Sequence, residues 1–229
     1  TGKIYSSFVN GTTGELVTIE ISNSPGLPSF DIIGMCDASI RESRGRIMTA
    51  IKKSGFSMPK GHITVSISPS FLRKSGSGFD LPIALGILMV SNQIPGLGTF
   101  ELYANGELSL NGDIHSTPGS VLRLLAVKNR KFHALIIPNE EKDSASCAQM
   151  PCSFVHNLRE ACGRITNHSF DSMIPSLKPF DDSINPILDF SVLKGQEKAS
   201  RTILLAAAML LISAVPCFAQ PYGPADLDI

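Results

Sequence analysis

The stretch Phe79-Asp80-Leu81-Pro82-Ile83-Ala84-Leu85-Gly86-Ile87-Leu88 decides the fold of this chain. Its apolar residues predict a strongly apolar helix over residues 80–91, which supplies a core together with the strands on either side. Pro82 falls in the first turn of this helix, where a missing N–H costs nothing. Asp80 comes directly before the apolar run and is expected to be the N-cap.

Strand and helix patterns alternate on both sides of this helix. Strands are expected at residues 4–9, 16–21, 30–33, 63–67, 102–110, 134–137 and 153–155. The link Asn10-Gly11-Thr12-Thr13-Gly14 has the composition of a hairpin turn. Further helices are expected from an N-cap at Asp37 to about Ser54, over 121–129 and over 158–162. This alternation indicates an α/β fold with layered helices and strands.

Composition restricts the function more than it identifies it. The 229 residues carry no formal net charge, so any nucleic-acid binding would need a local basic patch. The chain has no Trp, and its Tyr and Phe residues are scattered, so no aromatic platform for bases is visible. Five cysteines form no regular framework and no signal-peptide pattern is seen, which favours reduced thiols in a cytoplasmic protein.

The composition changes after the predicted domain at residues 1–166. A linker rich in Ser, Asp and Pro is expected at 167–188, and the remaining residues, 189–229, form a further segment. That segment contains Ile203–Ala219, an uncharged run at the short limit for a membrane span that includes Pro216. We interpret the run as a buried helix followed by a buried strand, with no membrane role.

Several motifs in series resemble the ComM/YifB family of magnesium-chelatase-like AAA+ proteins. The resemblance covers roughly residues 3–208 and lies in the stretches Tyr5-Ser6-Ser7, Pro25-Gly26-Leu27-Pro28-Ser29-Phe30-Asp31-Ile32-Ile33-Gly34, Arg41-Glu42-Ser43-Arg44, Ala50-Ile51-Lys52-Lys53-Ser54-Gly55-Phe56, Ile63-Thr64-Val65-Ser66, Phe79-Asp80-Leu81-Pro82-Ile83-Ala84-Leu85-Gly86, Gly106-Glu107-Leu108-Ser109-Leu110-Asn111-Gly112 and Gly195-Gln196-Glu197. It implies a ribosomal S5 domain 2-like fold, shared with the Lon protease domain, followed at 189–229 by a truncated start of an AAA+ module.

The resemblance also implies a function. Full-length members are ATP- and Mg²⁺-dependent hexameric rings, and ComM acts in DNA branch migration. Here residues 214–220 contain no glycine or lysine, whereas a phosphate loop needs a Gly turn, a Lys and a Ser or Thr. We therefore expect a non-catalytic domain without a nucleotide site and assign no catalytic, cofactor-binding or metal residue. Whether the chain has any enzyme activity stays open.

Two alternatives to this function remain. One is a stand-alone binding module without enzymatic activity. The other is a Lon-like Ser-Lys peptidase, which is disfavoured because the resemblance puts the Ser position on Gly78 and the Lys position on Val121.

Two groups of side chains are candidates for binding. Arg41, Arg44 and Lys74 are the residues we expect to contact DNA, weakly and through phosphates, although a solvated helix face is the commoner explanation for such charges. The second group is a cluster of cysteine and histidine residues whose spacing is looser than that of structural zinc sites, so no zinc is expected there. Its members are Cys147, Cys152, His156, Cys162 and His168.

Overall fold

The computed structural model describes residues 1–96, 98–170, 174–175, 201–202 and 205. The chain divides between Lys178 and Pro179, and the fold described below belongs to the first unit, Thr1–Lys178. Most of the predicted linker at 167–188, and nearly all of the predicted AAA+ start at 189–229, lie outside the described residues. Among the described residues, no helix is long and apolar enough to cross a membrane.

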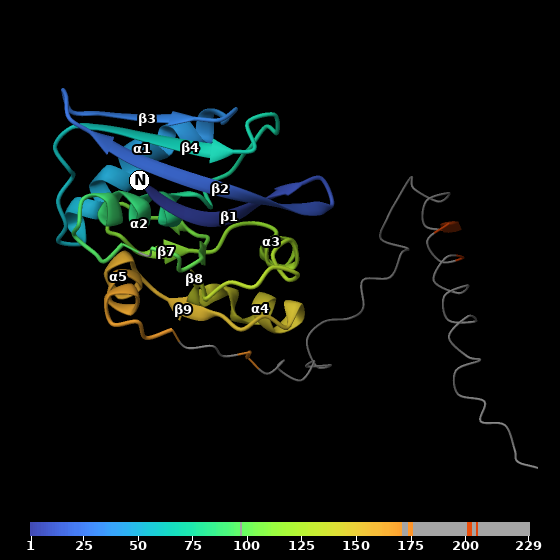
Figure 1. Ribbon diagram of the computed structural model, residues 1–229. Helices are drawn as coiled ribbons and strands as arrows, with labels where there is room; N and C mark the ends of the chain where they lie inside the picture. Colours follow the sequence, from blue (N-terminus) through green and yellow to red (C-terminus); the bar gives the residue numbers. More distant parts are fainter. Residues whose placement is uncertain (97, 171–173, 176–200, 203–204, 206–229) are drawn as a thin grey trace, which may run out of the picture. The chain divides into compact units, whose positions relative to one another are not determined.

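The centre of the unit is a seven-stranded mixed sheet (Figure 1). Its strands, in spatial order, are β3 (Ser29–Ile33), β4 (His62–Ser68), β2 (Thr13–Ser24), β1 (Gly2–Asn10), β5 (Leu102–Ala104), β8 (Ala134–Pro138) and β9 (Ser153–Val155). The β1–β2 and β2–β4 pairs are antiparallel, and the other neighbouring pairs are parallel. A separate ribbon pairs β6 (Glu107–Leu108) with β7 (Ile114–His115). The predicted α/β class is confirmed.

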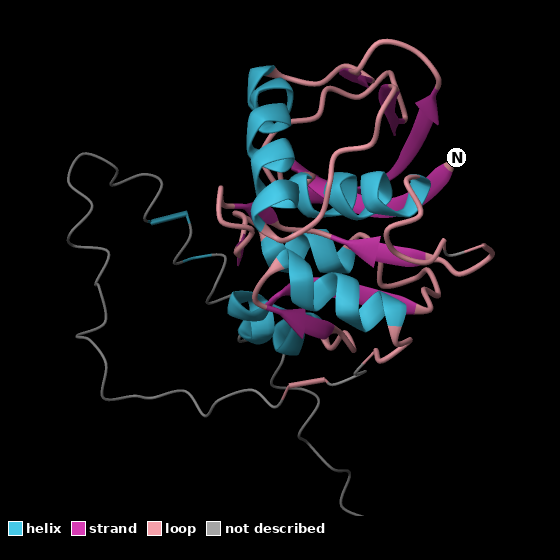
Figure 2. Cartoon of the chain, turned by 90° about the vertical axis from the view of Figure 1, so that its left-hand side faces the viewer, coloured by secondary structure: helices cyan, strands magenta, loops and turns pink. Residues whose placement is uncertain are grey.

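Helices cover both faces of the sheet (Figure 2). One apolar cluster joins the sheet to α1 (Ala38–Lys53), α2 (Asp80–Val90) and α5 (Leu158–Thr166). A second cluster, on the other face, includes residues of α3 (Ser120–Leu125) and α4 (Lys142–Ala148). A short 3₁₀ turn, η1 (Asn139–Glu141), precedes α4. Alternation along β1 shows the two faces, because Ile4 belongs to the first cluster and Tyr5 to the second.

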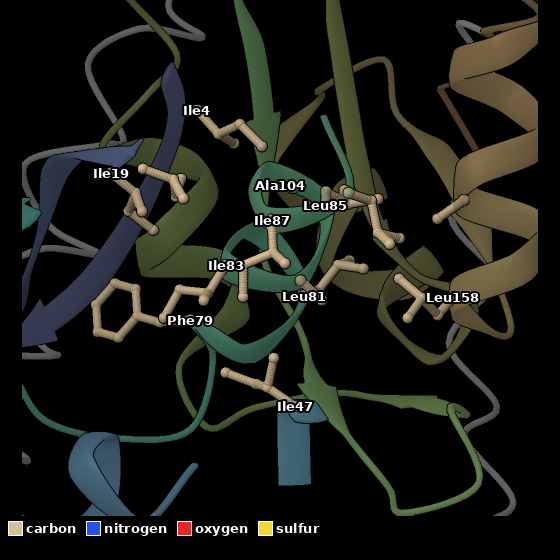
Figure 3. Packing of buried hydrophobic residues seen from close by; sticks show 14 of the residues in the cluster. Ile4, Ile19, Ile47, Phe79, Leu81, Ile83, Leu85, Ile87, Ala104 and Leu158 are labelled. Carbon is tan, nitrogen blue, oxygen red and sulfur yellow. The ribbon is translucent and has the colours of Figure 1, made fainter. Parts of the chain in front are cut away.

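The predicted apolar helix is the middle of the larger cluster. Every residue of α2 from Asp80 to Met89 is buried, and Leu81, Ile83 and Leu85 contribute to the packing shown in Figure 3. Burying a Leu or Ile side chain contributes about 2 kcal/mol relative to leaving it in water. The helix therefore accounts for a large part of the apolar area that stabilises the domain.

Local capping and turn chemistry account for several element boundaries. Asp37 caps α1 as predicted, since its Oδ1 accepts a hydrogen bond from Ile40 N at 3.1 Å. The predicted single strand at 102–110 is wrong, because Gly106 interrupts it with a φ of +154°. A Cβ on Gly106 would lie 2.7 Å from Ile114 Cγ2, so only glycine fits this break between β5 and β6.

Candidate nucleic-acid interface

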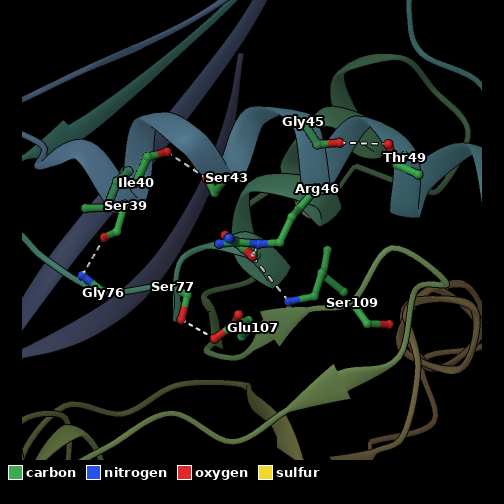
Figure 4. A network of polar contacts seen from close by, with 12 residues as sticks. Ser39, Ile40, Ser43, Gly45, Arg46, Thr49, Gly76, Ser77, Glu107 and Ser109 are labelled. Atoms are coloured by element: carbon green, nitrogen blue, oxygen red, sulfur yellow. Dashed lines mark hydrogen bonds and ion pairs between the residues drawn. The ribbon is translucent and has the colours of Figure 1, made fainter.

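The connection from β4 to α2, residues 69–79, runs past the start of α1. Lys74 O accepts a hydrogen bond from Asp37 N at 3.1 Å, and Lys74 N donates to Met35 O at 3.1 Å. Gly76 N donates to Ser39 Oγ at 3.2 Å (Figure 4). These bonds join two segments that are distant in sequence, and we call the place where they meet the α1 corner (residues 33–44 and 69–76).

Lys74 is the interior anchor of the α1 corner and does not belong to its surface. The residue is fully buried, and its Nζ donates to Gly34 O at 2.8 Å, to Leu72 O at 2.9 Å and to Pro69 O. Burial lowers the pKa of this ammonium. The prediction that Lys74 contributes to an exposed basic patch is therefore wrong, because its charge is directed at main-chain carbonyls.

The other two predicted residues do lie at the surface. Arg41 and Arg44 are exposed on α1, one helical turn apart. The guanidinium carbon of Arg44 lies 5.6 Å from the centre of the Phe30 ring, which places it beside the edge strand β3. Arg73 is also exposed and takes the place that the sequence suggested for Lys74. The α1 corner therefore carries three exposed arginines.

Apolar side chains are exposed at the same corner. Phe71 is 77% exposed, Met35 57% and Ile33 53%. Phe71 was missed at the sequence level because it looks like one of many scattered aromatics. Only the structure shows that its neighbour Leu72 packs against the core while Phe71 faces solvent.

We call the second half of the same connection, residues 77–79, the closed half, because other side chains fill the space beside Gly78. Gly78 is buried, and a Cβ on it would lie 2.9 Å from Asn105 Oδ1 and 3.0 Å from Arg123 Nη1. Arg123 Nη1 in turn donates to Ser7 O at 2.6 Å, and Asn105 Nδ2 donates to the same oxygen at 3.1 Å. The positions of a Ser-Lys pair thus hold glycine and valine, and polar side chains fill the space next to Gly78.

The polar groups around Asn105 form a satisfied interior network. Thr117 Oγ1 donates to Asn105 Oδ1 at 3.1 Å, and the Ser7 hydroxyl lies 2.7 Å from the Tyr103 hydroxyl. Burial raises the pKa of both Tyr103 and Glu141. These buried, hydrogen-bonded side chains tie β1, β5 and α3 together.

Asp80 is not the N-cap of α2. Phe79 holds that position, and Asp80 is buried, with Oδ2 accepting from Arg46 Nε at 3.0 Å and from Leu108 N at 3.3 Å. Burial raises the pKa of Asp80 to about 6. Nearby, Glu107 accepts a hydrogen bond from Ser77 (Figure 4). These contacts tie α1, α2 and β6 together across the core.

The cysteine and histidine cluster is dispersed. Cys152 packs in the apolar cluster of α3 and α4, whereas Cys162 packs in that of α1, α2 and α5. Burial raises the pKa of both thiols to about 12. His156 lies 3.1 Å from Glu160 through its Nδ1 atom. In the part of the chain that the structure describes, no three His, Cys, Asp or Glu residues are grouped to hold a metal ion.

The mixed sheet and the helices on both of its faces define an α/β domain. A family profile for "Subunit ChlI of Mg-chelatase" matches residues 19–141. The chain belongs to the magnesium-chelatase-like ComM/YifB family.

Two relatives match over most of the chain. "Competence protein ComM" of Haemophilus influenzae is 30% identical over 210 residues, which is 90% of this chain and 41% of that protein. "Uncharacterized protein YifB" of Escherichia coli is 28% identical over 210 residues, which is 90% of this chain and 40% of that protein. A protein of Mycobacterium tuberculosis is 33% identical over 145 residues, or 63% of this chain and 29% of its own length. The chain thus spans less than half the length of these relatives.

Proposed function

We propose that this chain is a non-catalytic domain of a magnesium-chelatase-like AAA+ protein and that it contacts DNA through the α1 corner. The observation that carries the proposal is the set of exposed guanidinium groups of Arg41, Arg44 and Arg73 around one fixed corner. Arginines hold phosphates through their forked donors, and such contacts give weak binding without sequence preference. We propose that this contact serves the branch migration of DNA by an ATP-driven ring.

Binding to a fluorescently labelled DNA at low salt tests the proposal. Replacing Arg41, Arg44 and Arg73 with Glu should abolish binding, because all three phosphate contacts become repulsive. The melting temperature should stay nearly unchanged, since all three side chains are exposed. For the wild-type chain, the logarithm of the affinity should fall with that of the salt concentration with a slope of about −2 to −3.

A matched control separates the effect of the α1 corner on binding from the effect of the net charge of the chain. Lys60, Lys128 and Lys131 are exposed lysines outside the α1 corner, and replacing them with Glu changes the net charge equally. This control should keep most of the wild-type binding. Equal loss in both triple variants, or no binding by the wild-type chain at low salt, would contradict the proposal.

A binding module that works without a nucleotide site is the second candidate. It is favoured by the sequence of residues 214–220, which has neither the glycine nor the lysine of a phosphate loop. We expect this chain to bind ATP no more tightly than roughly millimolar. Calorimetric titration of ATP into the chain extended to the length of its relatives separates the candidates, because only a domain of an AAA+ protein gains Mg²⁺-dependent binding there.

A further inference from the structure

The connection that carries Phe71 is fixed in place although Phe71 itself is exposed. Lys74 holds three carbonyls of the α1 corner from within, and those of Pro69 and Leu72 lie on either side of Phe71 in the sequence. Asp37 and Met35 bind the main chain of the same lysine. A loop with this many internal bonds presents its exposed ring in a defined place, so little ordering entropy remains to be lost on binding.

The α1 corner exposes apolar side chains and arginines together. Phe71 lies two residues from the exposed Arg73, and the Pro69–Lys74 segment bonds directly to the segment that begins α1. Arg41 stands in the first turns of that helix. An exposed aromatic ring on the same corner as exposed arginines matches a ligand that has both planar rings and negative charge.

We propose that Phe71 is a stacking platform for an unpaired base of single-stranded nucleic acid, with Arg41 and Arg73 holding the neighbouring phosphates. This inference rests on the proposed function and names the form of nucleic acid that the corner selects. An aromatic ring stacks on any base, whereas the bases of a duplex are already stacked on each other and only its phosphates are accessible. The corner should therefore prefer single strands over duplexes of the same length.

Met35 and Ile33 are further exposed apolar residues of the α1 corner. Both are more than half exposed, and Lys74 N bonds directly to Met35 O, which places this segment beside the one that carries Phe71. A thioether makes favourable contacts with aromatic rings, so Met35 suits a second base face better than it suits a phosphate. The apolar part of the corner and its cationic part thus correspond to the two parts of a nucleotide.

The test uses fluorescence anisotropy of an oligothymidylate of about 12 nucleotides and of a duplex of equal length, at low salt. Replacing Phe71 with Ala should weaken single-strand binding about tenfold or more and leave duplex binding nearly unchanged. Replacing Phe71 with Trp should preserve or strengthen single-strand binding, whereas Leu, which is apolar without a ring, should behave like Ala. Leu27→Ala is the matched control, because Leu27 is 88% exposed and precedes the opposite end of β3.

The outcomes separate this inference from the proposed function. Duplex binding that the three Arg→Glu changes abolish, combined with single-strand binding that Phe71→Ala leaves intact, would overturn the stacking platform and keep the phosphate contact. If the wild-type chain binds neither oligonucleotide, both fail, and the corner is then a surface for another class of partner. A Leu27→Ala effect as large as that of Phe71→Ala would also overturn the platform, since any exposed apolar residue would then suffice.

Discussion

The two halves of the β4–α2 connection differ in the exposure of their residues. We call residues 69–76 the open half and residues 77–79 the closed half. In the first half Lys74 is turned inward, and Phe71 and Arg73 are left in solvent. In the second half Gly78 lies against Asn105 and Arg123, where no side chain can be added without displacing a buried group. The closed half therefore contains Gly78, where the resemblance to Lon puts a Ser, and the open half carries the exposed Phe71.

This difference indicates where function can lie in the domain. A closed, hydrogen-bonded interior contributes stability and a unique packing but no reactive group. Phe71, Met35 and Ile33 are exposed on one corner and bury little of their apolar surface in the core, and we propose that a partner covers them. Changes in the closed half should therefore reduce stability, and changes in the open half should reduce binding.

The largest expected effect is on the closed half. Replacing Arg123 with Met removes the donors to Ser7 O and Pro118 O and leaves the buried Glu141 without the favourable charge beside it. The free energy of unfolding should fall by about 3 kcal/mol, because buried carbonyls lose a charged donor. Urea denaturation measures it, with Arg130→Met as control, because water screens the Arg130–Glu101 ion pair and the pair should contribute little to stability. Equal losses in the two variants would contradict a special role for the closed network.

Asp80, at the junction between the connection and α2, should make stability depend on pH. Burial raises its folded-state pKa from 3.8 to about 6, so the folded state binds the proton more tightly than the unfolded state. The protonated Asp80 therefore contributes fully to the free energy of unfolding below about pH 4. This contribution is lost as pH rises through about 6, and the loss is at most about 3 kcal/mol. In urea unfolding between pH 4 and 7, Asp80→Asn should lose less stability with rising pH than the wild type. Parallel curves would contradict this assignment.

Lys74 should show the anchoring role of the open half. Replacing it with Met keeps the length of the side chain but leaves the carbonyls of Gly34, Pro69 and Leu72 without their donor. We expect a loss of about 2 kcal/mol by urea denaturation, whereas Lys128→Met on the exposed surface should cost almost nothing. A Lys74 variant as stable as the wild type would mean that the corner is held by its main-chain bonds alone.

The smallest expected effect concerns Gly78 and tests whether a serine at this position can act as a nucleophile. Gly78→Ser restores the residue type that the resemblance to Lon expects, yet its Cβ must displace the ends of Asn105 and Arg123. We expect a loss of about 1–2 kcal/mol and no labelling by a covalent serine probe. Gly45→Ser is the control, since a Cβ on Gly45 meets nothing within 4 Å. Labelling of the Gly78→Ser variant alone would contradict the closed site.

The elements that the sequence predicted are those set by local chemistry. The apolar run of α2, the Asp37 cap of α1 and the strand Ser153–Val155 are all confirmed. In each case the signal lies within a few neighbouring residues, so no knowledge of the tertiary fold is needed. The predicted helix at 121–129 is shorter in the structure, where α3 ends at Leu125.

The residues that were misassigned depend on contacts distant in sequence. Lys74 looks like a surface lysine until Gly34 O, 40 residues away, is brought to its Nζ. Asp80 fits a cap by position, but Arg46 on another helix binds its carboxylate. Sequence reasoning named Arg41 and Arg44, which are exposed at the α1 corner, but it chose the buried Lys74 over its exposed neighbour Arg73 and did not foresee the exposed Phe71.

Amide hydrogen exchange with and without oligothymidylate compares the two halves of the connection in one experiment. The account predicts slower exchange on binding at residues 71–76 and in the first turns of α1, with no change at residues 77–79 or around Asn105 and Arg123. In the Phe71→Ala variant this protection should be lost while the pattern of the free protein is kept. Protection centred on the Asn105 network, or none at the α1 corner despite measurable binding, would contradict the central claim that the open half of the connection makes the contact.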